Sequence, residues 1–151
     1  MRGLSCAAER VGLSPVVEEL LVGVVADGFT LYSCGPRAAP HALVACYYWG
    51  DCADVLTVRD FDRVITARVP TPGPVDIFAP QIVVWAYEGS PQHAIRALLT
   101  LVHPAHPDAP TTEYPAPARL HVPRAQQRPM SIQLPIPSRA KARAARLATA
   151  R

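Results

Sequence analysis

Residues 41–58 read HALVACYYWGDCADVLTV and hold the clearest structural signal of the chain. Two apolar stretches rich in aromatic and β-branched residues flank the dipeptide Gly50-Asp51. A two-residue connection with glycine first is typical of a type II′ hairpin, and such a turn fixes the register of its strands. In that register Tyr47 faces Asp54. The pattern therefore predicts an antiparallel sheet built around this hairpin.

Further strands are predicted on both sides of the hairpin, over residues 29–34, 63–69 and 81–87. The last of these is the most apolar, with four large hydrophobic residues in succession. Short links between consecutive strands favour antiparallel pairing. The central part of the chain thus predicts a sheet of about five strands.

Two helices are expected to flank this sheet. The first covers residues 15–26, where apolar residues recur with the spacing of one buried helix face. The second begins at Pro91 and ends before Pro104. A serine and then a proline open each helix, as is common at helix starts. The predicted class is α+β, with both helices on one face of the sheet.

The composition changes at His103. Residues 1–103 hold seven Arg against ten Asp and Glu, a net charge of −3, whereas residues 104–151 hold seven Arg and one Lys against two acids, a net charge of +6. Nine prolines fall between residues 104 and 137. Such a composition favours disorder. The sequence predicts a compact domain over residues 1–103 and a largely disordered basic tail over residues 104–151.

Two pieces of the tail depart from this picture. Residues 130–136 alternate apolar and polar side chains, like a strand that adds to a sheet edge, and Pro135 restricts it to an outer position. Residues 138–151 are rich in alanine and favour a short basic helix. Its cations form a candidate polyanion contact for sequence-blind phosphate binding, although a solvated linker or solubilising tail is the favoured interpretation. They are Arg139, Lys141, Arg143 and Arg146.

The cysteines and the missing export or membrane signals indicate a cytoplasmic protein. No apolar run reaches the length of a membrane span, and charged residues interrupt the N-terminus early. No Cys-x-x-Cys pair is present, so a disulfide framework is not expected. No glycine-rich phosphate loop is present either, and we expect no cofactor.

Cys34 and His41 are the weak catalytic candidates. A thiol at a strand exit with Arg37 three residues on has a cation nearby to lower its pKa, and His41 is a candidate base. The spacing matches no cysteine-hydrolase signature, so a structural thiol is the favoured interpretation. The pair nevertheless supports an alternative function as a small thiol enzyme or ligand carrier.

Two clusters of residues that could bind a metal ion are interpreted as structural. His103, His106 and Asp108 are interrupted by prolines, so no helix presents both imidazoles together, and no metal site is expected. Aspartates crowd two neighbouring turns, where Asp is the ordinary residue, and turn chemistry is favoured over cation binding or acid and base catalysis. The aspartates concerned are Asp51, Asp54, Asp60 and Asp62.

Aromatic residues on the predicted strands form the candidate partner-binding set. Tyr47 and Trp49 share one face of their strand, and Trp85 and Tyr87 share one face of theirs, with Arg59 nearby. If the helices cover the opposite face, this patch is exposed and marks a binding site. If the helices cover the same face, the aromatic residues belong to the core, and this interpretation is favoured.

The leading hypothesis is a small non-catalytic binding or adaptor module that acts on another protein, or on itself, through its sheet surface or edge. Its basis is an aromatic sheet without assembled catalytic groups. The alternatives are a nucleic-acid-associated protein with a phosphate-binding tail and the thiol enzyme or carrier. No pattern points to a membrane partner.

Overall fold

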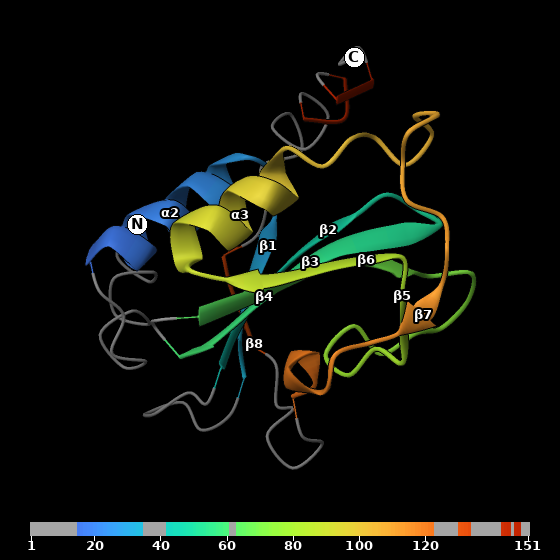
Figure 1. The fold of residues 1–151 in the computed structure, drawn as a ribbon. Coiled ribbons are helices and arrows are strands. Elements are labelled where there is room, and N and C mark those ends of the chain that lie inside the picture. Colours follow the sequence, from blue (N-terminus) through green and yellow to red (C-terminus); the bar gives the residue numbers. More distant parts are fainter. Residues whose placement is uncertain are drawn as a thin grey trace.

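A computed structural model gives the structure of the protein and describes residues 15–34, 42–60, 63–122, 130–133, 143–145 and 147–148. In this part of the chain two α-helices pack on one face of an antiparallel sheet, which confirms the predicted α+β class (Figure 1). The elements follow in the order helix α2 (Pro15–Ala26), strands β1 (Thr30–Cys34), β2 (Ala42–Tyr48), β3 (Cys52–Asp60), β4 (Arg63–Pro70), β5 (Ile82–Val83) and β6 (Trp85–Gly89), helix α3 (Pro91–Leu99), strand β7 (Tyr114–Pro115), the short 3-10 helix η1 (Ala118–Leu120) and strand β8 (Met130–Gln133).

The main sheet has the strand order β6-β4-β3-β2-β1-β8, with antiparallel pairing between neighbours. Its first five strands are the predicted sheet. The hairpin register is as predicted, since Tyr47 lies opposite Asp54. At the turn the Trp49 amide donates to the Cys52 carbonyl at 2.8 Å, and Gly50 has a φ of 107°, a conformation that glycine adopts without steric penalty.

Helices α2 and α3 bury their apolar stripes on one face of this sheet (Figure 1). The bounds of α2 are those predicted, and α3 begins at the predicted Pro91. Ser90 does not cap the backbone, because its hydroxyl instead meets the His93 ring at 2.6 Å. The helix-side core includes Val17, Leu21, Val24, Phe29, Leu43, Leu56, Val64, Ile95 and Leu98.

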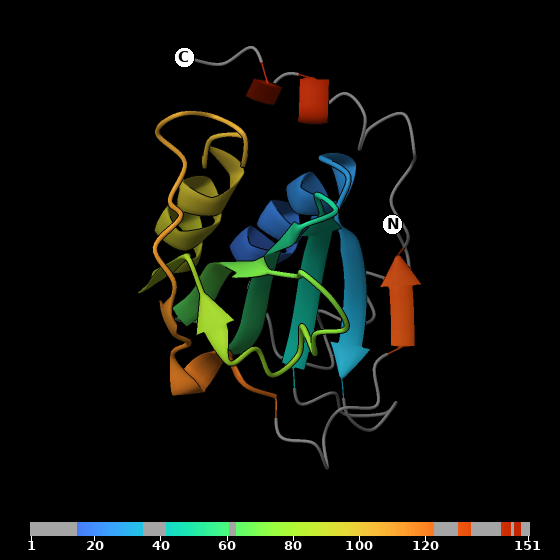
Figure 2. The ribbon, with the colours of Figure 1, turned by 90° about the vertical axis from the view of Figure 1, so that its right-hand side faces the viewer.

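The opposite face of the sheet is covered as well, by the chain leading into β5 and by residues 116–122 (Figure 2). Leu120 and Val122 are fully buried there. The packed segment 116–122 thus lies beyond the boundary predicted at His103. Prolines prevent a regular hydrogen-bond ladder, but they do not prevent an irregular segment from burying apolar side chains. Residues 104–122 continue the compact body.

The predicted strand over residues 81–87 is two strands in the structure. The break falls at Val84, whose amide donates to the Arg68 carbonyl at 3.0 Å. β5 pairs with β7 in a separate two-stranded sheet, whereas β6 pairs with β4. The apolar residues 82–85 contribute to both cores of the protein. Val83 is buried on the second face of the sheet, and Trp85 packs against the helix-side core.

Part of the tail joins the body as an edge strand, the kind of element that the alternating pattern predicted. β8 pairs antiparallel with β1 and so adds a strand to the sheet edge, while the further apolar residues Leu134 and Ile136 lie outside the described residues. Within the predicted C-terminal helix, residues 143–145 and 147–148 are helical. None of the helices in the described ranges is long and apolar enough to cross a membrane.

Candidate functional site

The row of side chains that crosses the sheet beneath the helices is unusually polar. Tyr47 on β2 is paired with Asp54 on β3, and Asp54 is paired with Arg68 on β4. Asp54 and Arg68 are 0% and 1% exposed. Lone buried charges are strongly disfavoured, so this pair requires full mutual compensation.

Asp54 is the centre of this arrangement. Its Oδ1 accepts a hydrogen bond from Arg68 Nε at 2.7 Å, and its Oδ2 accepts one from Arg68 Nη2 at 3.1 Å. The Trp49 indole nitrogen donates to Oδ2 at 3.0 Å. Arg68 Nη1 also donates to the Val102 carbonyl at 2.8 Å. The two-point pairing holds both side chains in fixed orientations.

A second guanidinium, from Arg143 in the tail, completes the cluster. Arg143 is fully buried. Its Nη2 donates to Asp54 Oδ2 at 3.2 Å, and its Nη1 donates to Asp27 Oδ2 at 3.0 Å and to the Leu99 carbonyl at 3.5 Å. Two carboxylates therefore face two guanidinium groups, so the formal charges of this cluster cancel.

Aromatic rings surround the same guanidinium. The central carbon of Arg143 lies 5.0 Å from the ring centre of Phe29, 4.9 Å from that of Tyr47 and 5.6 Å from that of Trp49. Cations are attracted to such ring faces within about 6 Å, most strongly when water is excluded. We call these three rings together with Asp27 and Asp54 the arginine cage.

Arg143 does not fit the arginine cage perfectly. Its Nε is buried and has no hydrogen-bond partner among the described residues. An unsatisfied buried donor costs about 1–3 kcal/mol. Burial raises the pKa of Tyr47 and outweighs the lowering by Arg143, so the phenol stays neutral beside the guanidinium.

The predicted partner-binding residues do not form one surface. Tyr47 is buried, and Trp49 and Trp85 are half-buried against the helix-side core, because the helices cover the face that they share. Tyr87 is 42% exposed. Arg59 is exposed, and its Nη1 donates to the His121 carbonyl. The interpretation of the aromatic set as core holds for the residues beneath the helices.

The tail cations also differ from the prediction where they are described. Arg143 faces the buried carboxylate of Asp54 and the partly buried carboxylate of Asp27 and not solvent, which corrects its assignment as a polyanion contact. The reason is that its counter-charges, Asp27 and Asp54, are remote in sequence. Arg139, Lys141 and Arg146 lie outside the described residues.

The aspartates of the predicted turns lie in different surroundings, and His103 packs against an aromatic ring. Asp54 lies in β3, as the predicted register requires, but its carboxylate binds Arg68 and Arg143 and does not serve turn chemistry. Asp51 is exposed in the turn, and Asp60 ends β3. Asp62 lies outside the described residues. The His103 ring packs edge-on against Trp49 at 4.8 Å.

His106 and Asp108 lie close together, with His106 Nδ1 3.9 Å from Asp108 Oδ2. His106 accepts a hydrogen bond from the Asp108 amide at 3.0 Å. Within the described ranges no three His, Cys, Asp or Glu side chains are placed to hold a metal ion.

Cys34 is a buried free thiol, whereas His41 lies outside the described residues. Burial, with a smaller contribution from Asp76, raises the pKa of Cys34 to about 11. The thiol is therefore protonated at neutral pH, opposite to what a nucleophile needs.

We predict that alkylation of Cys34 by iodoacetamide, followed by mass spectrometry, is slow at neutral pH because the thiolate is rare. Its rate should rise steadily up to about pH 10 without an inflection. A reference peptide with one cysteine should show its inflection near 8.5, the pKa of a free thiol. The same inflection at Cys34 is the result that contradicts this assignment and restores the thiol hypothesis.

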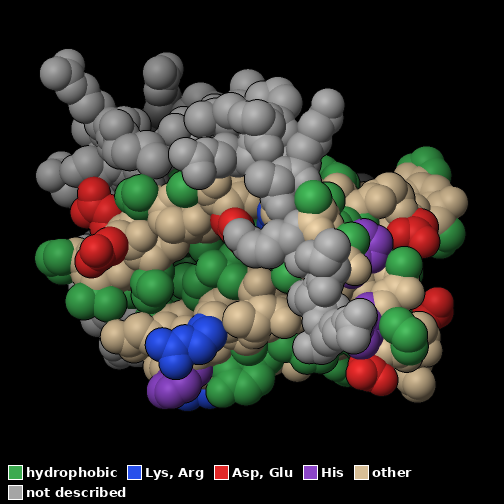
Figure 3. All heavy atoms as spheres, turned by 90° about the horizontal axis from the view of Figure 1, so that it is seen from above, with side chains coloured by type: hydrophobic (Ala, Val, Ile, Leu, Met, Phe, Trp, Pro, Cys, Tyr) green, Lys and Arg blue, Asp and Glu red, His purple; other side chains and the backbone are tan. Residues whose placement is uncertain are grey.

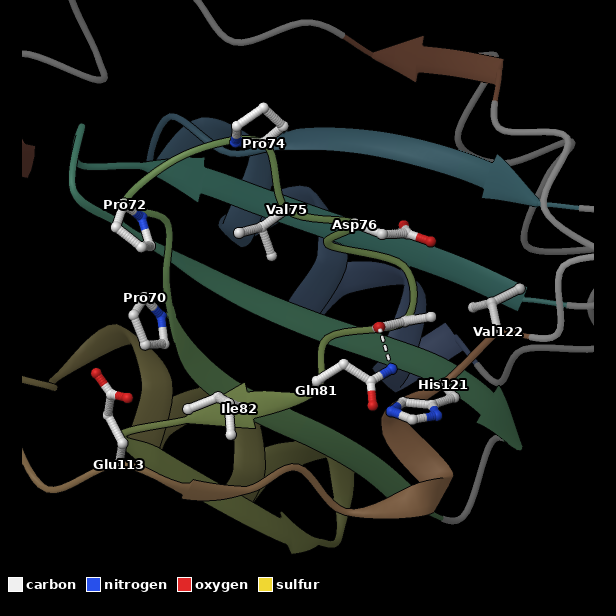
Figure 4. A pocket seen from close by; sticks show the side chains of 11 residues that line it. Pro70, Pro72, Pro74, Val75, Asp76, Gln81, Ile82, Glu113, His121 and Val122 are labelled. Atoms are coloured by element: carbon white, nitrogen blue, oxygen red, sulfur yellow. Dashed lines mark hydrogen bonds between the residues drawn. The ribbon is translucent and has the colours of Figure 1, made fainter.

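Two pockets are candidates for ligand binding. One, of about 640 Å³, lies on the second face and is lined by Pro70, Pro72, Pro74, Asp76 and Glu113 among others (Figure 4). Its two carboxylates lie at different ends of the pocket in Figure 4, so they do not converge on one point. The Asp76 carboxylate accepts a hydrogen bond from the Phe78 amide at 2.9 Å. This pocket carries no assembled acid and base pair.

The other pocket, of about 780 Å³, is a groove between α2 and α3, lined by Val16, Leu20, Asp27, Leu99 and Leu147 among others. Hydrophobic side chains gather on this side of the molecule (Figure 3). Leu147 is only 6% exposed. Because Asp27 lines this groove and also binds Arg143, the groove adjoins the arginine cage.

Comparison with known proteins found no match: no protein-family model, no curated protein and no solved structure is significantly similar to the chain.

Proposed function

We propose that the protein is a non-catalytic, cytoplasmic binding module that captures a segment of a partner protein where its own tail docks. The observation that carries this proposal is the tail residue Arg143, fully buried between carboxylates of the body. A surface that holds one segment through a strand, a charge and an apolar side chain suits another segment of the same kind.

The docking surface has three parts. The edge of β1 receives β8 through backbone pairing. The arginine cage receives Arg143, and Leu147 forms part of the wall of the groove between α2 and α3. Strand addition supplies affinity, and the side-chain pockets supply specificity. The proposed partner is a protein segment, including the tail of a second copy of this chain.

Binding of a partner on the open surface of the sheet is not supported, because both faces of the sheet are covered in the described part of the chain. The edge and the adjoining groove support it better. The raised pKa of Cys34 speaks against the thiol alternative. The burial of Arg143 removes one of the four cations on which the phosphate-binding alternative relied.

The test is binding of a fluorescent peptide of residues 130–148 to the full-length chain. The wild-type tail competes as an intramolecular ligand at an effective concentration in the millimolar range. Leu147→Glu places a charge in the apolar groove and should release the tail. We expect this variant to bind the peptide at least about tenfold more tightly than the wild type, as measured by anisotropy.

Ala148→Glu is the matched control, since Ala148 is exposed and adjacent to Leu147. It adds the same charge outside the groove and should bind the peptide as weakly as the wild type. Equal affinity of the Leu147 and Ala148 variants contradicts the proposal. So does the absence of peptide binding to every chain at about 1 mM peptide.

A further inference from the structure

We infer that the arginine cage is a guanidinium-binding site, and that it recognises partner segments by an arginine followed four residues later by leucine. This inference rests on the proposed function and names the chemistry of its ligand. Arg143 and Leu147 are the intramolecular example of that motif.

The shape of the cage fits a planar fork better than a point charge. Nη1 and Nη2 of Arg143 bind two different carboxylates, those of Asp27 and Asp54. Three ring faces surround the same group. A guanidinium combines stacking on rings with directed hydrogen bonds and is weakly hydrated, whereas an ammonium is compact and strongly hydrated. The cage therefore favours arginine over lysine.

The spacing of the motif follows from the positions of the two receiving sites. The described residues between Arg143 and Leu147 are helical, and residues four apart lie on the same side of a helix. The cage and the groove share Asp27, so an arginine and a leucine on one helical face reach both at once. With a spacing that puts the arginine and the leucine on different sides of the helix, only one of them can reach its site.

The chain's own arginine is an imperfect ligand, which leaves it open to replacement. Its Nε has no partner among the described residues. It also comes from far along the chain, 89 residues from Asp54 and 116 from Asp27. A partner segment whose arginine Nε finds an acceptor binds the cage more tightly than the tail does. The tail is therefore an occupant that such a segment displaces.

The first experiment fills an emptied cage with a small cation. Arg143→Ala removes the occupant, and Arg143→Met does so with less loss of volume. We expect millimolar N-ethylguanidinium chloride to raise the Tm of both variants by about 2 °C or more above ethylammonium chloride at equal ionic strength. The wild type, with its cage occupied, should respond equally to the two salts. An equal response of the variants overturns the inference.

The second experiment keeps the cage intact and changes the peptide. The peptide of residues 130–148 with Arg143→Lys should bind the Leu147→Glu chain at least about tenfold more weakly than the unchanged peptide. Equal binding of the two peptides overturns the inference but leaves the proposed function standing. If neither peptide binds, the proposed function fails, and the Tm experiment alone decides whether the cage holds guanidinium.

Discussion

Asp54→Asn is expected to lower the free energy of unfolding by about 3–5 kcal/mol, because two buried guanidinium groups then lose their shared counter-charge. Asparagine keeps the size of the side chain and one acceptor oxygen, so the effect isolates the charge. Arg143→Ala should cost less, since Arg68 keeps both of its bonds to Asp54. Urea unfolding followed by circular dichroism measures both values.

Asp51→Asn is the matched control for this substitution. Asp51 is exposed and lies in the turn of the same hairpin. Its replacement should change stability by less than about 0.5 kcal/mol, as is usual for surface positions. If Asp54→Asn is no more destabilising than this control, the buried charge cluster does not hold the helices and the tail to the sheet.

The second large effect concerns the segment after His103. Leu120→Ala should destabilise the protein by about 2–5 kcal/mol, the range for truncating a buried leucine. The side chain closes the second face of the sheet, so its loss leaves a cavity against that core. The same urea measurement gives this value.

Val75→Ala serves as the control on the same side of the molecule, because Val75 is 38% exposed. Its truncation should change stability much less. Equal small effects at both positions are the result that contradicts the packing of residues 116–122, and they favour the domain boundary predicted at His103.

Local patterns were sufficient for the elements whose contacts are close in sequence. The spacing of apolar residues predicted α2 to its ends, and the turn at Gly50 predicted the pairing of Tyr47 with Asp54. The alternation after Met130 predicted a strand at a sheet edge. In each case the periodicity or the turn chemistry alone determines the geometry.

The charge cluster could not be predicted in this way, because its members come from residues 27, 54, 68 and 143. One signal was present in the sequence. Asp54 alternates with Leu56 and Val58, so a carboxylate stands on the apolar side of its strand. A charge in that position requires a buried partner. The sequence does not reveal which of fourteen arginines supplies it.

The C-terminal ends of helices α2 and α3 favour positive charge at the arginine cage even before a hydrogen bond forms. Helix α2 ends at Ala26, directly before Asp27, and helix α3 ends at Leu99, whose carbonyl meets Arg143. The C-terminal end of a helix carries a partial negative charge from its aligned peptide dipoles. Two such ends converge on the arginine cage, so it attracts positive side chains and repels acidic ones. We expect a phosphorylated or acidic segment to be disfavoured at this position by about 0.3–1 kcal/mol for each helix end.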